Sequence, residues 1–102
     1  MATADSGGQP HVVPVGFRVS ADAAAIEVGG RNFGNTRKYR DIRANPKVAI
    51  VIDDLASVTP WMPRGVEVRG TAVLQDGGGG PVASGQPWAR IMPERIVSWG
   101  IN

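Results

Sequence analysis

The sequence predicts a small, mainly β domain in which short antiparallel strands form a barrel around one helix. Three observations support this fold class. The 102 residues, 42% of them apolar and 20% charged, are enough for one hydrophobic core. Glycine and proline, with 14 and 8 copies, divide the chain into short segments. Most of these segments are β-branched or alternate between apolar and polar residues, and only one is helical in character. We therefore expect residues 1–102 to form a single domain.

The predicted strands are residues 10–20, 24–29, 47–53, 66–74 and 89–99. In the first of them, Pro14 lacks a backbone N–H and requires a bulge or an edge position. Residues 47–53 form a continuous apolar run, which is typical of a strand that is buried on both faces. In the last strand we expect a break near Pro93. Four to six strands of this kind around one helix fit an antiparallel barrel.

Residues 35–44 are predicted to form the helix. Asn35 or Thr36 can cap its start, Tyr39 and Ile42 are spaced to share one apolar face, and the Asn-Pro pair at 45–46 ends it. Residues 75–87 contain five glycines and two prolines. We expect them to form a flexible surface loop that can be shortened without loss of folding.

The composition excludes several kinds of site. Without cysteine, the chain has no disulfide, thiolate metal site or cysteine nucleophile. Its single histidine, His11, cannot form a multi-histidine metal site, and we expect a structural or surface role for it rather than proton donation. No apolar run approaches the ~20 residues of a membrane span. The first six residues lack the basic and apolar regions of a secretory signal, so we expect a cytoplasmic protein. Because cysteine is absent and histidine occurs once, we also expect no metal.

The charge is concentrated in one segment. The formal net charge is only +2, yet residues 31–47 hold six basic side chains and one acid, Asp41. The basic residues are Arg31, Arg37, Lys38, Arg40, Arg43 and Lys47. Such a local excess of positive charge favours an anionic ligand.

The predicted helix start is the most informative site. The first turn of a helix carries partial positive charge and unpaired N–H groups, so acidic residues are normally favoured there. This sequence places Arg37 and Lys38 there instead, directly after the Thr36 hydroxyl. A bound phosphate would compensate these charges and accept hydrogen bonds from all of these groups. The alternative is a solvated basic face without a ligand.

Four segments together carry a resemblance to a known family. They are PHVVPVGF, NTRKYRDIRANPKVAIVIDD, RGVEVRGTAVL and RIMPERIVSWGI. In this order they resemble the split β-barrel flavoproteins that are similar to pyridoxamine 5′-phosphate oxidase (the PPOX class). More narrowly, they resemble the actinobacterial branch that uses the deazaflavin coenzyme F420. The most specific part is the Thr-Arg-Lys triplet at 36–38 followed by Asn-Pro at 45–46.

The resemblance implies a homodimer of antiparallel split β-barrels of the FMN-binding type, with the cofactor at the subunit interface. In such proteins a Ser/Thr-Arg-Lys triplet holds the cofactor phosphate, the backbone of an early strand passes along the flavin-type ring, and a tryptophan near the chain end approaches the cofactor. The matching positions here are Thr36, Arg37 and Lys38 for the phosphate, Pro14, Val15 and Gly16 for the ring, and Trp99. Family members usually carry a helix and most of a strand before the position of Ala2, which this sequence lacks.

The leading functional hypothesis is an F420-dependent oxidoreductase that transfers a hydride between its cofactor and a small organic acceptor. FMN is the alternative cofactor, and a non-catalytic flavin- or deazaflavin-binding protein for storage or sensing is the alternative function. Trp61, in a proline-flanked loop, either covers the cofactor of the other subunit or has no such role. An RNA-binding barrel is less favoured, because the basic segment lacks the exposed aromatic platform on which bases stack, and Tyr39 is the one aromatic residue of the predicted helix. We therefore expect neither a nucleic-acid nor a membrane partner.

Overall fold

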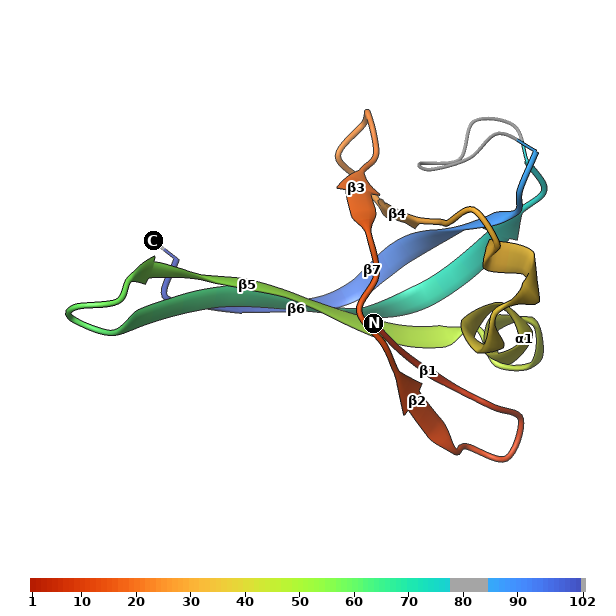
Figure 1. The fold of residues 1–102 in the computed structure, drawn as a ribbon, viewed down its shortest axis with the longest axis horizontal. Coiled ribbons are helices and arrows are strands. Elements are labelled where there is room, and N and C mark those ends of the chain that lie inside the picture. The colour runs from red at the N-terminus through yellow and green to blue at the C-terminus, as the bar shows by residue number, and fades with distance from the viewer. Residues whose placement is uncertain (78–84, 102) are drawn as a thin grey trace.

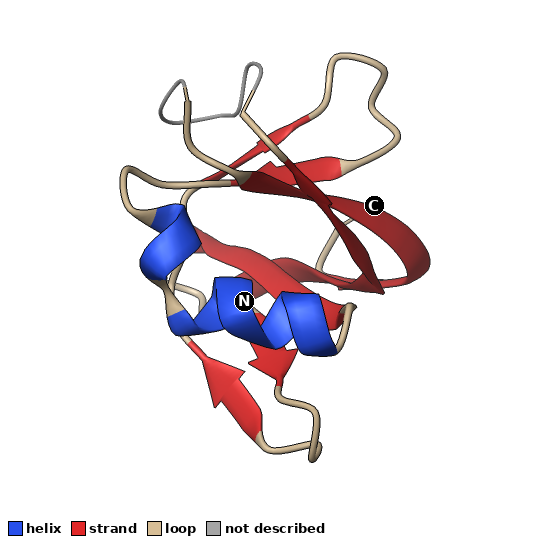
Figure 2. Ribbon diagram, turned by 90° about the vertical axis from the view of Figure 1, so that its right-hand side faces the viewer, coloured by secondary structure: helices blue, strands red, loops and turns tan. Residues whose placement is uncertain are grey.

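The computed structural model describes residues 1–77 and 85–101, in which one antiparallel sheet of seven strands curls into a half-barrel (Figures 1 and 2). The strands are β1 (Ala2–Ala4), β2 (Pro10–Val12), β3 (Phe17–Val19), β4 (Ile26–Val28), β5 (Lys47–Ser57), β6 (Met62–Gln75) and β7 (Trp88–Trp99). Their order across the sheet is β2-β1-β5-β6-β7-β4-β3. A 3-10 turn, η1 (Phe33–Asn35), leads into helix α1 (Arg37–Ala44), which lies across one end of the half-barrel (Figure 2). The mainly β class with one short helix is confirmed.

The first predicted strand is divided in two. Instead of one strand over residues 10–20, β2 and β3 lie at opposite edges of the sheet, and residues 13–16 cross between them. We call residues 13–16 the crossing segment. Pro14 lies within the crossing segment, outside the strands, so its lack of a backbone N–H costs no hydrogen bond between strands. The short strand β1, which pairs with both β2 and β5, was not predicted from the sequence.

Strand β5 is longer and less buried than its apolar run predicts. It continues to Ser57 and pairs with β6 along its length, from Lys47 opposite Thr71 to Ser57 opposite Met62. Val48 and Ile50 are buried, but Val51 is 56% exposed. The expectation that both faces are buried is therefore wrong within one chain, because nothing in the described part of the chain covers the second face.

Strand β7 continues through Pro93 instead of breaking there. The pairing with β6 shifts by one residue at this point, so that Arg69 lies opposite Arg95 and Gly70 opposite Pro93. Such a bulge accommodates a proline, because the bulged strand is locally released from regular ladder bonding. Gly70 lies so close to β7 that an added Cβ would be 2.2 Å from the Met92 carbonyl oxygen.

The core fills the concave side of the sheet beneath α1 and η1. Phe33, Val28 and Ile91 are the largest fully buried side chains, and Ile42 carries α1 into the same cluster. The alternation predicted for residues 66–74 is confirmed, since Val68, Gly70 and Ala72 are buried while Arg69 and Val73 are exposed. The predicted helix is likewise confirmed, with Thr36 as its N-cap.

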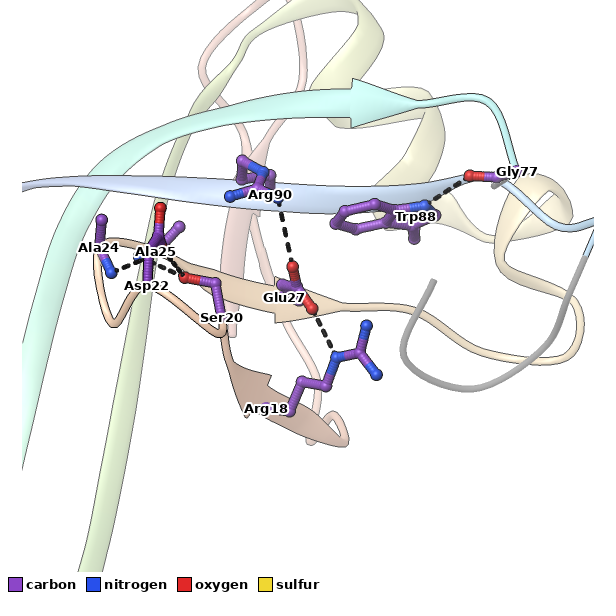
Figure 3. Close-up of polar contacts among 9 residues, drawn as sticks. All are labelled: Arg18, Ser20, Asp22, Ala24, Ala25, Glu27, Gly77, Trp88 and Arg90. Carbon is purple, nitrogen blue, oxygen red and sulfur yellow. Dashed lines mark hydrogen bonds and ion pairs between the residues drawn. The ribbon is translucent and has the colours of Figure 1, made fainter. Parts of the chain in front are cut away.

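A buried carboxylate ties the edge strand β3 to its neighbours. Glu27 of β4 is 5% exposed and accepts hydrogen bonds from Arg18 of β3 and, at 3.4 Å, from Arg90 of β7 (Figure 3). The indole N–H of Trp88 donates to the carbonyl oxygen of Gly77 at 2.8 Å and holds together the base of the β6–β7 connection. Residues 78–84 of the predicted flexible loop lie outside the described residues, so the expectation that it can be shortened stays a prediction.

Candidate functional site

A largely apolar groove of about 510 Å³ follows the free edge of β5. Ala49 pairs with Ala2 of β1, and beyond it no described strand pairs with β5 on this side. The groove occupies that edge, between Ile50–Asp53 of β5 and residues 12–15 and 17, and Met1 also lines it. The lining is apolar except for Asp53, the one acidic or basic side chain among the described residues that line it.

The crossing segment forms the wall of this groove. Pro14 and Val15, both predicted to approach a flavin-type ring, line it directly, and Val15 also packs against the core. Gly16 follows them, and an added Cβ there would meet no atom within 4 Å. The backbone at Gly16 is therefore open to the close approach of a flat ligand.

The start of α1 is built as a capped helix terminus. The backbone N–H of Tyr39 donates to the Thr36 hydroxyl at 3.3 Å, and this hydroxyl in turn donates to the carbonyl oxygen of Phe33 at 2.7 Å. The proton of the hydroxyl is thus already in use. The amides of Arg37 and Lys38 belong to the first turn, where a helix offers no acceptor of its own, and they are the groups available to an anion.

The two cations of the first turn have different neighbours. Arg37 is about half exposed, and its Nε lies 3.8 Å from Oδ2 of Asp41, a buried carboxylate that also accepts a 2.8 Å hydrogen bond from Thr3. Lys38 Nζ lies 5.5 Å from the centroid of the Phe33 ring. Burial and then the charge of Lys38 lower the pKa of the Met1 amino group.

Trp99 of β7 lies against Gly65 of β6, close to the groove residue Asp53. In the sheet register, Asp53 of β5, Gly65 of β6 and Trp99 of β7 form one row across three strands. A Cβ on Gly65 would be 2.4 Å from Cζ2 of Trp99 and 3.1 Å from Cβ of Asp53, so the indole covers Gly65 beside Asp53. Figure 1 shows α1 and the C-terminus at opposite ends of the molecule.

Of the predicted site residues, Pro14 and Val15 line the groove, whereas Trp99 lies beside Gly65 in the row that contains the groove residue Asp53. The triplet 36–38 and Trp99 are not neighbours within one chain. From the sequence, Asp53 and Asp54 are expected to end the strand in a turn, and this expectation is wrong, because β5 continues to Ser57 and places Asp53 on the groove.

Two other candidate residues lie outside the groove. His11 is opposite Thr3 in the β1–β2 pair, and its Nδ1 is buried without a hydrogen-bond partner in the described part of the chain. Trp61 lies in the turn between β5 and β6 and is 67% exposed, and its predicted role as a cover for the cofactor of the other subunit stays a prediction.

Comparison with known proteins decides the family. Residues 1–79 match the family described as "Pyridoxamine 5'-phosphate oxidase". The chain belongs to this family. It is also 39% identical over 105 aligned positions to a 5a,11a-dehydrotetracycline/5a,11a-dehydrooxytetracycline reductase of Streptomyces rimosus, covering 100% of this chain and 73% of the relative. The match to a reductase supports oxidoreductase chemistry, and the family suggests a flavin-type cofactor.

Solved structures agree on the fold. The HupZ protein of Group A Streptococcus superposes with a TM-score of 0.71 at 26% identity, over 95% of this chain and 80% of that one. A histidine-to-alanine variant of the same protein gives a TM-score of 0.72 at 22% identity, over 96% and 86%. The split-barrel fold that the resemblance implied is therefore confirmed. No helix in residues 1–77 and 85–101 is long and apolar enough to cross a membrane.

Proposed function

We propose that this protein is a cytoplasmic, F420-dependent reductase that transfers a hydride to a carbon–carbon double bond of a polycyclic organic acceptor. The observation that carries the proposal is the 39% identity, across the whole chain, to a reductase of dehydrotetracyclines. The name of that relative specifies substrates with an additional double bond between ring carbons. An acceptor of the same class, flat and largely apolar, suits the apolar groove beside β5.

The residues present fit a cofactor with a flat ring and a phosphate-bearing tail. The open backbone at Gly16 and the apolar wall of Pro14 and Val15 suit the ring. The first-turn amides of α1, with Arg37 and Lys38, suit the phosphate. Thr36 serves this site by capping the helix, since its hydroxyl proton is donated to Phe33.

The cofactor supplies the hydride, and the chain supplies binding and orientation. The apolar groove would exclude water from the bound ligands and limit the orientations in which they can meet. One acceptor carbon takes the hydride and the other takes a proton from solvent, so the product gains two hydrogens. No general acid of this chain is required for this reaction.

Separate titrations with F420 and FMN test the cofactor. We expect micromolar affinity for F420, and oxidation of reduced F420 when a dehydrotetracycline or a simple enone is added. Micromolar binding of FMN without binding of F420 would contradict F420 as the cofactor and identify FMN in its place. F420 binding without turnover of any enone, quinone or nitro acceptor would support the non-catalytic alternative.

We further propose that the protein acts as a homodimer. Strands β5, β6 and β7 extend beyond the half-barrel as a three-stranded arm (Figure 1). This arm carries exposed apolar side chains on both faces. Adjacent β7 residues point to opposite faces, yet Ile96 is 61% and Val97 38% exposed. Further exposed apolar residues of the arm are Leu55, Val58, Trp61, Met62, Trp99 and Ile101. A second copy would cover this surface and bring its own arm to the site.

Light scattering at micromolar concentration is expected to give twice the chain mass of 10.7 kDa. Ile96→Lys places a charge in the proposed interface and is expected to give monomers. Val73→Lys is the control, because Val73 is 45% exposed on β6 but lies outside the arm. A wild-type protein that elutes as a monomer contradicts the dimer.

A further inference from the structure

We propose that Asp41 is the positioning residue of the phosphate site at the start of α1. Its carboxylate holds the guanidinium of Arg37 in place, so that the anionic part of the cofactor meets a cation that is already ordered. The inference rests on the proposed function, because it concerns the phosphate of the cofactor proposed there. It adds a residue that does not touch the cofactor and acts on it through Arg37.

Asp41 occupies a place in the helix where an apolar side chain is expected. It is 4% exposed and precedes Ile42, which packs into the core. A buried carboxylate costs free energy unless it is paired, and a well-packed apolar residue in such a place is often equally or more stabilising. Departures of this kind from the pattern of a stable core are expected at functional sites. The charge at position 41 therefore points to a role beyond stability.

The Asp41 carboxylate has a partner on each side. Its Oδ2 accepts a hydrogen bond from the Thr3 hydroxyl of β1 at 2.8 Å, and the same oxygen lies 3.8 Å from Nε of Arg37, one turn earlier in α1. The Asp41 side chain is 5% exposed and that of Arg37 45%. The pair thus joins a group fixed in the interior to a cation at the surface. In the described part of the chain Arg37 forms no ion pair with any other residue.

Lys38, the other cation of the first turn, has no such partner. Its Nζ lies 5.5 Å from the centroid of the Phe33 ring, and it forms no ion pair among the described residues. A long side chain that is free before binding must be ordered when the anion arrives, which lowers the affinity. Arg37 is the cation of this turn to which the chain supplies a carboxylate in advance.

Replacement of Asp41 by asparagine separates positioning from a direct effect of charge. Asparagine has nearly the same shape, and its carbonyl oxygen can still accept the hydrogen bond from Thr3. If Asp41 acted on an anion only through its own negative charge, removal of that charge would strengthen phosphate binding. If Asp41 positions Arg37, the same change frees the guanidinium and weakens phosphate binding. The two roles therefore predict changes of opposite sign.

Ligand pairs with and without a phosphate isolate this effect. FMN and riboflavin form one pair, and F420 and the corresponding deazaflavin without its phosphate-bearing tail form the other. Fluorescence titration of the full chain gives the ratio of dissociation constants within each pair. In the pair that the wild-type protein distinguishes, we expect Asp41→Asn to lower the preference for the phosphate-bearing ligand about fivefold, as the ordering of one long side chain predicts. An unchanged or increased preference overturns the proposal, as does a wild-type protein that distinguishes the members of neither pair.

A double variant shows whether the effect passes through Arg37. When Arg37 is already glutamine, Asp41→Asn is expected to change the preference by less than about twofold, because the group that Asp41 positions is gone. An equal loss in the presence and absence of Arg37 would mean that Asp41 does not act through it.

Thr3→Val is the structural control. It removes the buried hydrogen bond and leaves the carboxylate beside Arg37, so we expect a lower Tm and an unchanged preference for the phosphate-bearing ligand. If Thr3→Val lowers this preference as much as Asp41→Asn does, the role of Asp41 is structural and the proposal is wrong.

The outcome is independent of the reductase assignment. The ratios are measured without an acceptor and without turnover, so a protein that prefers FMN or has no reductase activity would contradict the proposed function and leave the result for Asp41 intact. Conversely, an active F420-dependent reductase in which Asp41→Asn leaves the ratio unchanged would retain the proposed function and refute the positioning role.

Discussion

Replacing Arg37 and Lys38 together by glutamine is expected to weaken binding of the phosphate-bearing cofactor by a factor of a hundred or more. Hydrogen bonds to charged groups are worth about 1.5–3 kcal/mol each, so the loss of two removes roughly 3–6 kcal/mol. The first-turn amides and the Thr36 cap remain, which keeps the helix in place. Calorimetric titration of the variant and of the wild-type protein with F420 measures the change in the dissociation constant.

Glutamine is the suitable replacement because of Asp41. Glutamate at position 37 would face this buried carboxylate one turn along the helix and would destabilise the fold for reasons unrelated to the cofactor. The matched control is Arg40→Gln with Arg43→Gln, which removes the same charge from exposed positions on the same helix. We expect the control to lower affinity less than about threefold, as screened surface charges do. An equal loss in both double variants would contradict a phosphate site at the helix start.

The elements that the sequence predicts well have local causes. The helix follows from a cap at Thr36, the spacing of Tyr39 and Ile42 and a terminating Asn-Pro pair, all within one segment. The face alternation of β6 follows from the two-residue period of a strand. Neither inference requires knowledge of what the segment packs against.

The elements that were missed depend on distant partners. Three residues are too few to show a period, so β1 is recognisable only through its pairing with β2 and β5. The division of residues 10–20 into two edge strands likewise depends on where each half pairs. At Pro93 the proline alone indicates a break, and the strand continues because Gly70 lies opposite the bulge.

The parts of the candidate site differ in the same way, because one depends on local sequence and the others depend on distant partners. The helix start is visible in the sequence because two cations occupy a place where local electrostatics favours acids. The groove is not visible, since it arises where the crossing segment meets the free edge of β5. The row of Asp53, Gly65 and Trp99 joins positions on three strands and depends on the register of the whole sheet.

Gly70→Ala is expected to lower the free energy of unfolding by about 3 kcal/mol or more. The added Cβ would lie 2.2 Å from the Met92 carbonyl oxygen and 3.2 Å from the Pro93 Cα. Both are backbone atoms, so no side-chain rotation relieves the clash, and the bulge that carries β7 past Pro93 must shift. Overpacking of this kind costs about 1–3 kcal/mol when side chains yield, and a backbone clash in a paired strand lies at or above that range.

Thermal and urea unfolding measure this effect, and Gly30→Ala is its control. For a domain of this size, each kcal/mol corresponds to roughly 4–8 °C in Tm, so Gly70→Ala is expected to lower the Tm by about 12 °C or more. A Cβ at Gly30 would meet no atom within 4 Å, and there alanine restricts only the unfolded chain. We therefore expect Gly30→Ala to change the free energy of unfolding by less than about 1 kcal/mol. Equal stability of the two variants would mean that Gly70 is not packed against β7 and that the pairing of β6 with Pro93 is wrong.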